Sequence, residues 1–163
     1  MANKTTMKAQ LIGQVFIYVM TIVLVTFILT YGYKAITTFK DKANQVSYIQ
    51  FKNNMQNTIE TLALDYGSVK VKEFIVPDDI TIVCFVNTFP EVPRLSNTGY
   101  PIIEDSVNSG VNKNAFLIGN GVEESFDAGK ILIDEDLLCI PALTGRIKLN
   151  MEGKGDHTAI TAG

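Results

Sequence analysis

The sequence predicts an α+β protein, with a long N-terminal helix that is first apolar and then amphipathic, followed by a mainly antiparallel β head domain. Three observations predict this fold class. Residues 10–33 form an apolar run without a charged side chain, no proline interrupts residues 10–65, and after Gly67 apolar residues alternate with polar ones. We therefore expect three segments, namely a leader peptide (residues 1–9), the long helix (residues 10–66) and the head (residues 67–163).

The apolar run at residues 10–33 is long enough to cross a membrane. A spanning helix needs about 20 mostly apolar residues, whereas a secretory signal peptide has an apolar core of about 7–15 residues before its cleavage site. The run therefore predicts a helix that remains in the mature protein, within a bilayer or a bundle of helices. Lysines flank both ends, so chain size and cysteine usage, rather than charge, favour a cytoplasmic N-terminus. Aromatic residues lie toward the ends of the run, as at a membrane interface: Phe16, Tyr18, Tyr31 and Tyr33.

The second half of the predicted helix is amphipathic. Its apolar residues recur at spacings of three, four and multiples of these, which indicates one apolar face that would connect the helix to the head. Gly67 suits the left-handed conformation just past a helix end, so it predicts the stop. The apolar face consists of Ile36, Phe39, Ala43, Val46, Met55, Ile59 and Leu62, with Tyr48 and Phe51 beside it.

The remainder of the chain reads as short strands separated by turns. The connections are short, which favours antiparallel pairing. Residues 87–114 are rich in proline, glycine and small polar residues, and they predict a long loop that serves as an exposed contact or adhesive surface. The predicted strands are residues 69–76, 80–86, 115–118, 130–133, 137–140, 146–151 and 157–161.

The two cysteines, Cys84 and Cys139, lie far apart within apolar runs. A zinc site would need closely spaced pairs such as C-x-x-C, so the spacing argues against one. Two alternatives remain open at this point. Either both residues are buried thiols that pack as small hydrophobic groups, or they form one disulfide between two strands of a domain that lies outside the cytoplasm.

Composition and motifs point away from catalysis and nucleic-acid binding. The net charge is −3 and the cations are scattered among acids, whereas a nucleic-acid surface needs clustered lysine and arginine. His157 is the single histidine, and the sequence contains no G-x-S-x-G, phosphate loop or H-E-x-x-H. The acids at residues 134–136, like Glu123, Glu124 and Asp127, read as solvated turns, because the order of a calcium-binding loop is missing. We expect no enzyme activity, cofactor or metal site.

Lys8-Ala9-Gln10-Leu11 separates a short basic leader from the apolar run. Together with the helix that continues beyond the run and the β-rich C-terminal domain, this order resembles the type IV pilin-like proteins, in the archaeal style with a class III signal peptide. In that family a membrane peptidase cuts after a small residue preceded by a basic one. The resemblance implies a processing site at Lys8, Ala9 and Gln10, with cleavage before Gln10. It also puts Gln14 at the fifth mature position, where many members have a glutamate that meets a neighbouring subunit's amine.

The resemblance implies a structural subunit of an extracellular type IV pilus-like filament. A uniformly apolar helix needs either lipid or a bundle of its own copies around it, so the chain would wait in the cytoplasmic membrane and then join a homo-oligomeric filament. Its other partners would be a prepilin peptidase and the pilus assembly machinery. An alternative is a monomeric single-pass anchor for an extracytoplasmic binding domain, and a membrane enzyme is a third. The implied filament-core positions include Gln14, Phe16, Val23 and Phe27.

Overall fold

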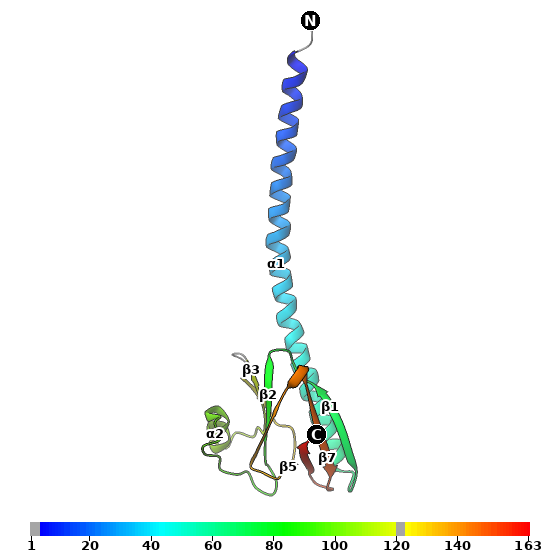
Figure 1. Ribbon diagram of the computed structural model, residues 1–163, viewed down its shortest axis with the longest axis vertical. Coiled ribbons are helices and arrows are strands. Elements are labelled where there is room, and N and C mark those ends of the chain that lie inside the picture. Colours follow the sequence, from blue (N-terminus) through cyan, green and yellow to red (C-terminus); the bar gives the residue numbers. More distant parts are fainter. Residues whose placement is uncertain (1–3, 120–122) are drawn as a thin grey trace. The chain divides into compact units, whose positions relative to one another are not determined.

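The protein is described by a computed structural model, which covers the backbone of residues 4–119 and 123–163 and the side chains of residues 14–40, 42–119 and 124–163 (Figure 1). The chain forms two compact units, Met1–Ala43 and Asn44–Gly163. A single helix, α1 (Lys4–Ala63), contributes to both. The second unit, called the head below, therefore begins within the helix, at Asn44. A long helix followed by a mostly antiparallel β domain confirms the predicted α+β class.

The head contains two four-stranded sheets. Sheet 1 has the order β1-β7-β8-β5 and sheet 2 the order β4-β3-β2-β6. All neighbouring strands are antiparallel except β5 and β8, which are parallel. The strands are β1 (Val69–Ile75), β2 (Ile80–Val86), β3 (Ala115–Gly119), β4 (Glu123–Phe126), β5 (Ile131–Leu132), β6 (Leu137–Pro141), β7 (Arg146–Gly153) and β8 (Thr158–Ala162).

Two elements differ from the sequence-based expectation. Residues 87–114 are not one loop, because they contain the helix α2 (Pro101–Asn108). Proline at the start of a helix costs no hydrogen bond, and Ile103 and Val107, four residues apart, are both buried. The expectation also missed β4, whose sequence Glu-Glu-Ser-Phe contains a single apolar residue and so carries little strand signal.

The main core lies between the last turns of α1 and the inner faces of both sheets. Phe51, Met55, Ile59 and Leu62 are 0–6% exposed and form the helical side of this core. The N-terminal part of the predicted apolar face behaves differently, since Ile36, Phe39 and Val46 are 52–73% exposed. The sheets supply Phe74, Val83, Phe85, Leu117, Ile140, Ile147, Leu149, Met151 and Ile160.

The end of α1 is held by the hairpin between β7 and β8. The Gly155 amide donates to the carbonyl of Ala63 at 2.7 Å, and the buried Thr158 hydroxyl donates to the carbonyl of Ile59 at 2.8 Å. A side chain at Gly153 would meet the carbonyl oxygen of Leu62 at 2.0 Å, so this close approach requires glycine. These bonds satisfy carbonyl groups that a helix end otherwise leaves open.

A second, smaller apolar cluster lies on the opposite face of sheet 2. Its buried members are Cys84, Val86, Leu95, Ile103, Val107 and Phe116, so α2 covers part of this face. This face of sheet 2 is thus divided between an area covered by α2 and a partly exposed area that contains Ile82, Ile118 and Leu137.

The helical side of the core gives a direct test of the fold. We expect Phe51→Ala to lower the free energy of unfolding of the head by about 3–5 kcal/mol, because a large buried ring is replaced by a cavity. Ile49→Ala, two residues away on the same helix and 52% exposed, is the matched control and should change stability by about 0.5 kcal/mol or less. Denaturant unfolding of the full chain in detergent, followed by circular dichroism, measures both. Equal effects of the two substitutions would contradict the assigned core.

Candidate functional site

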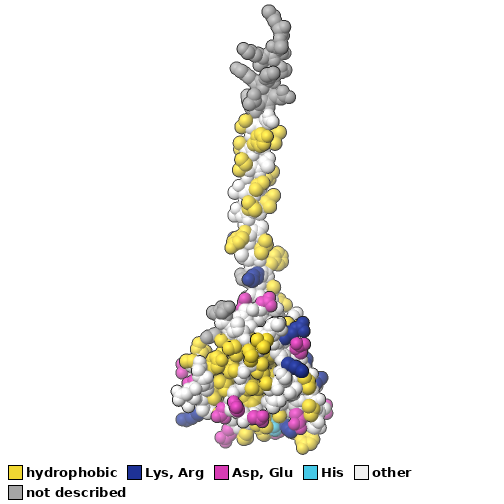
Figure 2. Space-filling view, in the orientation of Figure 1, with side chains coloured by type: hydrophobic (Ala, Val, Ile, Leu, Met, Phe, Trp, Pro, Cys, Tyr) yellow, Lys and Arg dark blue, Asp and Glu magenta, His cyan; other side chains and the backbone are white. Residues whose placement is uncertain are grey.

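The first unit is dominated by an exposed apolar surface on α1, called the apolar band below. It extends from Val15 to Tyr33, and its large side chains are 44–73% exposed (Figure 2). At about 1.5 Å per residue the band is about 27 Å long, which matches the roughly 30 Å hydrocarbon core of a bilayer. The described part of the helix, Gln14–Ala63, is long and apolar enough to cross a membrane. The large side chains of the band are Val15, Phe16, Ile17, Tyr18, Val19, Met20, Ile22, Val23, Leu24, Val25, Phe27, Ile28, Leu29, Tyr31 and Tyr33.

The threonines in the band do not present free donors to a neighbour. The Thr21, Thr26 and Thr30 hydroxyls donate to carbonyl oxygens four residues earlier, at 2.7–2.8 Å. Each hydroxyl is therefore satisfied by its own helix, and the side chain can turn its methyl group outward. Phe27 and Tyr31 stack one turn apart, with ring centroids separated by 6.0 Å. The threonines of the band consequently offer packing surface rather than free hydrogen-bond donors.

The structure places the predicted core positions on this band. Phe16, Val23 and Phe27 are 62%, 44% and 55% exposed, and Gln14 is exposed at its N-terminal end. The predicted processing site, Lys8, Ala9 and Gln10, lies outside the residues whose side chains the structure describes. The predicted filament-core positions thus lie along the band, and both their role in assembly and the cleavage site stay predictions.

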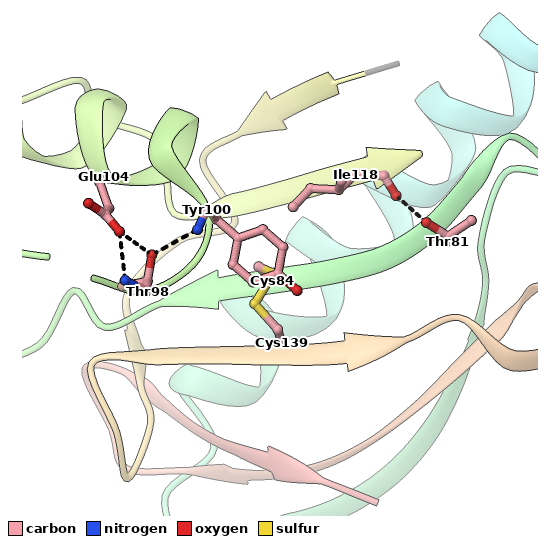
Figure 3. The surroundings of a disulfide bond; sticks show 7 residues. All are labelled: Thr81, Cys84, Thr98, Tyr100, Glu104, Ile118 and Cys139. Atoms are coloured by element: carbon pink, nitrogen blue, oxygen red, sulfur yellow. Dashed lines mark hydrogen bonds between the residues drawn. A yellow bond between two sulfur atoms is a disulfide. The ribbon is translucent and has the colours of Figure 1, made fainter. Parts of the chain in front are cut away.

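A disulfide joins Cys84 on β2 to Cys139 on β6 (Figure 3). The two residues are direct cross-strand partners in the antiparallel pair, which places their Cα atoms 4.0 Å apart. Tyr100, at the start of α2, packs against the cluster that contains this bond. The described chain therefore contains no free cysteine, and the covalent bond fixes the register of the edge strand β6 within sheet 2.

The segment before α2 is fixed by a small hydrogen-bond network (Figure 3). The Glu104 carboxylate accepts hydrogen bonds from the Thr98 amide at 2.6 Å and the Thr98 hydroxyl at 2.7 Å. These bonds favour the charged form and lower the pKa of Glu104. Since a lowered pKa means that protonation opposes folding, this contact persists at neutral pH and is lost as the pH falls through the lowered pKa.

Beside α2 lies an apolar hollow of about 250 Å³. Its polar side-chain groups are the hydroxyls of Tyr100, Ser106 and Ser125 and the carboxylate of Glu124. No sequence pattern indicates this hollow, because it exists only once α2 has folded over sheet 2. Its apolar walls come from Tyr100, Pro101, Ile102, Ile103, Phe116, Leu117 and Ile118.

His157 is a buried residue that is held by packing and by a neighbouring carboxylate. It is 8% exposed, its Nδ1 lies 2.6 Å from the Asp156 carboxylate, and its ring stacks on Phe89 with centroids 3.9 Å apart. Within the described ranges, no group of three or more histidine, cysteine, aspartate or glutamate side chains could hold a metal ion.

Comparison with protein-family models, with curated proteins and with solved structures finds no match to this chain.

The disulfide carries a stability expectation. Cys84 and Cys139 are 55 residues apart in sequence, and closing a loop of this size stabilises a fold by about 4 kcal/mol in the chain-entropy account. We expect Cys84→Ala/Cys139→Ala to lower the free energy of unfolding by up to about 4 kcal/mol. Denaturant unfolding with and without reductant measures the effect, and reductant should leave the double variant unchanged. Titration of two free thiols in the unreduced, unfolded protein would contradict the bond.

Proposed function

We propose that the protein is a structural subunit of an extracellular type IV pilus-like filament, in which the apolar bands of many copies pack together and the heads form the outer surface. The observation that carries the proposal is the apolar band itself. Its side chains are exposed all round the helix from Val15 to Tyr33, and such a surface is stable only in lipid or among similar helices. Before assembly the chain would lie in the cytoplasmic membrane.

The energetics fit a subunit that moves between two environments. Burying a large apolar side chain contributes about 1.5–3 kcal/mol, so the band as a whole contributes a gross term of some tens of kcal/mol. Lipid and a helical bundle bury nearly the same surface, so transfer from one to the other has a small net cost. Lipid tails are as apolar as leucine side chains, so the hydrophobic effect does not favour the bundle. Other contacts must therefore favour the filament.

Gln14 is one source of such a contact. It is exposed at the start of the band, and an unpaired amide in an apolar core is costly. If cleavage leaves Gln10 as the first residue, a neighbouring subunit's N-terminal amine would supply a donor for the Gln14 carbonyl oxygen. This bond would be weaker than an ion pair with glutamate.

A second candidate function is a monomeric anchored domain that binds a ligand outside the cell. The hollow beside α2 favours it, because apolar pockets with a few polar groups are typical of small-ligand sites. Its volume of about 250 Å³ lies just below the range of about 300–1,000 Å³ that is usual for such sites. The two functions differ in what happens to the N-terminus and in whether copies associate.

The apolar band supplies the first test. We expect Val23→Asp to abolish filaments, because a charge in the middle of the band would be buried without a partner. One charge costs about 3 kcal/mol in a spanning helix, which is small beside the band's total, so the variant should still reach the membrane with its head folded. Val23→Thr is the matched control, because the hydroxyl can bond its own helix as Thr26 does. Electron microscopy and membrane fractionation measure the outcome, and normal filaments of the aspartate variant would count against the proposal.

The N-terminus supplies the second test. We expect mass spectrometry of filament subunits to show a chain that begins at Gln10, and Ala9→Leu to retain the leader because the peptidase requires a small residue there. Ala2→Leu, elsewhere in the leader, is the control and should not affect cleavage. A full-length chain beginning at Met1 in the mature protein would instead support the anchored-domain function.

A further inference from the structure

One edge of sheet 1 is cationic and partly apolar. β1 is the edge strand in the order β1-β7-β8-β5, and Val69, Val71 and Ile75 on it are 71%, 55% and 73% exposed. Exposed edge strands of this kind are templates for association with another chain. The edge, called the cationic edge below, is defined by β1 and its neighbour β7.

The charges on the cationic edge are unbalanced. Its two carboxylates have partners, since Glu73 lies 3.4 Å from Arg146 and Glu152 lies 2.6 Å from Lys154. Lys70, Lys72 and Lys148 have no ion pair among the described residues. The Lys72 amine donates to Asn54 and Thr58 at 2.7 Å, and burial together with the nearby Lys70 lowers the pKa of Lys72. Lys70 and Lys72 are thus close enough to repel each other. Lys148, in contrast, lies on the opposite face of the sheet, where its cross-strand partner is Glu73.

The opposite edge of sheet 1 is acidic. β5 ends at Leu132, and the chain then leaves the sheet through Asp134, Glu135 and Asp136, all exposed, before β6 begins. No lysine or arginine occurs in residues 131–145. Where β5 ends, a hollow of about 140 Å³ opens beside β8, called the acidic hollow below. It is lined by Ile133, Asp134, Glu135, Leu138, Ile160, Thr161 and Ala162.

The two edges lie at the same level along the strands. Thr161 of the acidic hollow pairs with Asn150 on β7, which pairs with Val71 on β1. The flanking rows connect Ile160 to Lys70 through Met151, and Ala162 to Lys72 through Leu149. Neighbouring strands are about 4.8 Å apart. Lys70 and Lys72 therefore lie at one end of these rows of paired residues, and the acidic hollow lies at the other end. A copy displaced across the strands would therefore bring its lysines level with the acids of the next.

We propose that the cationic edge of one copy docks into the acidic hollow of a second copy, with Lys70 on one face of the edge and Lys148 on the other facing Asp134 and Glu135, and with the exposed β1 side chains covering the apolar lining. The contact is heterologous, because it joins two different patches of the same molecule. Heterologous contacts continue from copy to copy instead of closing as a twofold dimer. The inference rests on the proposed filament function and supplies the head contacts that would favour the filament over the membrane.

The test uses full-length protein in phosphatidylcholine vesicles, with energy transfer between donor- and acceptor-labelled copies as the readout of association. We expect Lys70→Glu/Lys148→Glu, and separately Asp134→Lys/Glu135→Lys, to weaken association by about tenfold or more, because like charges would then face each other. Mixing the two variants should restore it, since each reversed patch then meets an opposite charge. The fourfold variant has the wild-type net charge and should associate as wild type does.

Two controls separate docking from other effects. Lys113→Glu changes an exposed lysine next to β3 and should leave association unchanged, while 0.5 M salt should weaken wild-type association because it screens exposed charges. Wild-type association by the Lys70→Glu/Lys148→Glu variant, or no recovery in the mixture, would overturn the proposal. Filaments that tolerate these charge reversals would overturn the docking contact and leave the filament function standing. Charge-dependent association in vesicles without any filament formation would overturn the filament function and leave the docking contact standing.

Discussion

The constraint on which the rest of this molecule depends is that the apolar band cannot face water. The band has no charged side chain, its large residues are exposed all round the helix, and its threonines bond their own backbone. It therefore needs continuous apolar surroundings along about 27 Å. A head with a similar exposed apolar surface would also need to be covered by lipid or by other helices. Instead, the helical residues that belong to the head keep their apolar face, Phe51 to Leu62, inside its core.

The head is built to hold the end of α1 and to keep two separate surfaces in place. The β7–β8 hairpin bonds the last turns of the helix through Thr158 and Gly155. On sheet 2 the disulfide and α2 fix the far face, and on sheet 1 the shared rows fix the level of both edges. The covered face of sheet 2 is thus a closed layer, whereas the charged edges of sheet 1 remain exposed to other molecules.

Much of this architecture could be predicted from the sequence because it depends on local patterns. Hydrophobic periodicity predicted α1 and most strands, and uninterrupted apolar composition predicted the band. What the sequence could not reveal depends on pairing between distant segments. The disulfide required the register that sets Cys84 opposite Cys139, and α2 required a sheet face on which Ile103 and Val107 could be buried. The exposure of Ile36 and Phe39 was missed for the same reason, since periodicity predicts a face but not what covers it.

For the proposed filament subunit, the balance between membrane and filament would follow from these surfaces. Because lipid and a helical bundle cover the apolar band almost equally, the band would restrict a subunit to these two environments without deciding between them. The decision falls to polar groups that lipid leaves unsatisfied. Gln14 at the start of the band is such a group, and the charged edges of sheet 1, which lie on the exposed surface of the head, would also gain partners from neighbouring copies in the proposed filament. Exposed charge pairs are individually weak, so a preference for the filament would grow with the number of contacts each subunit makes.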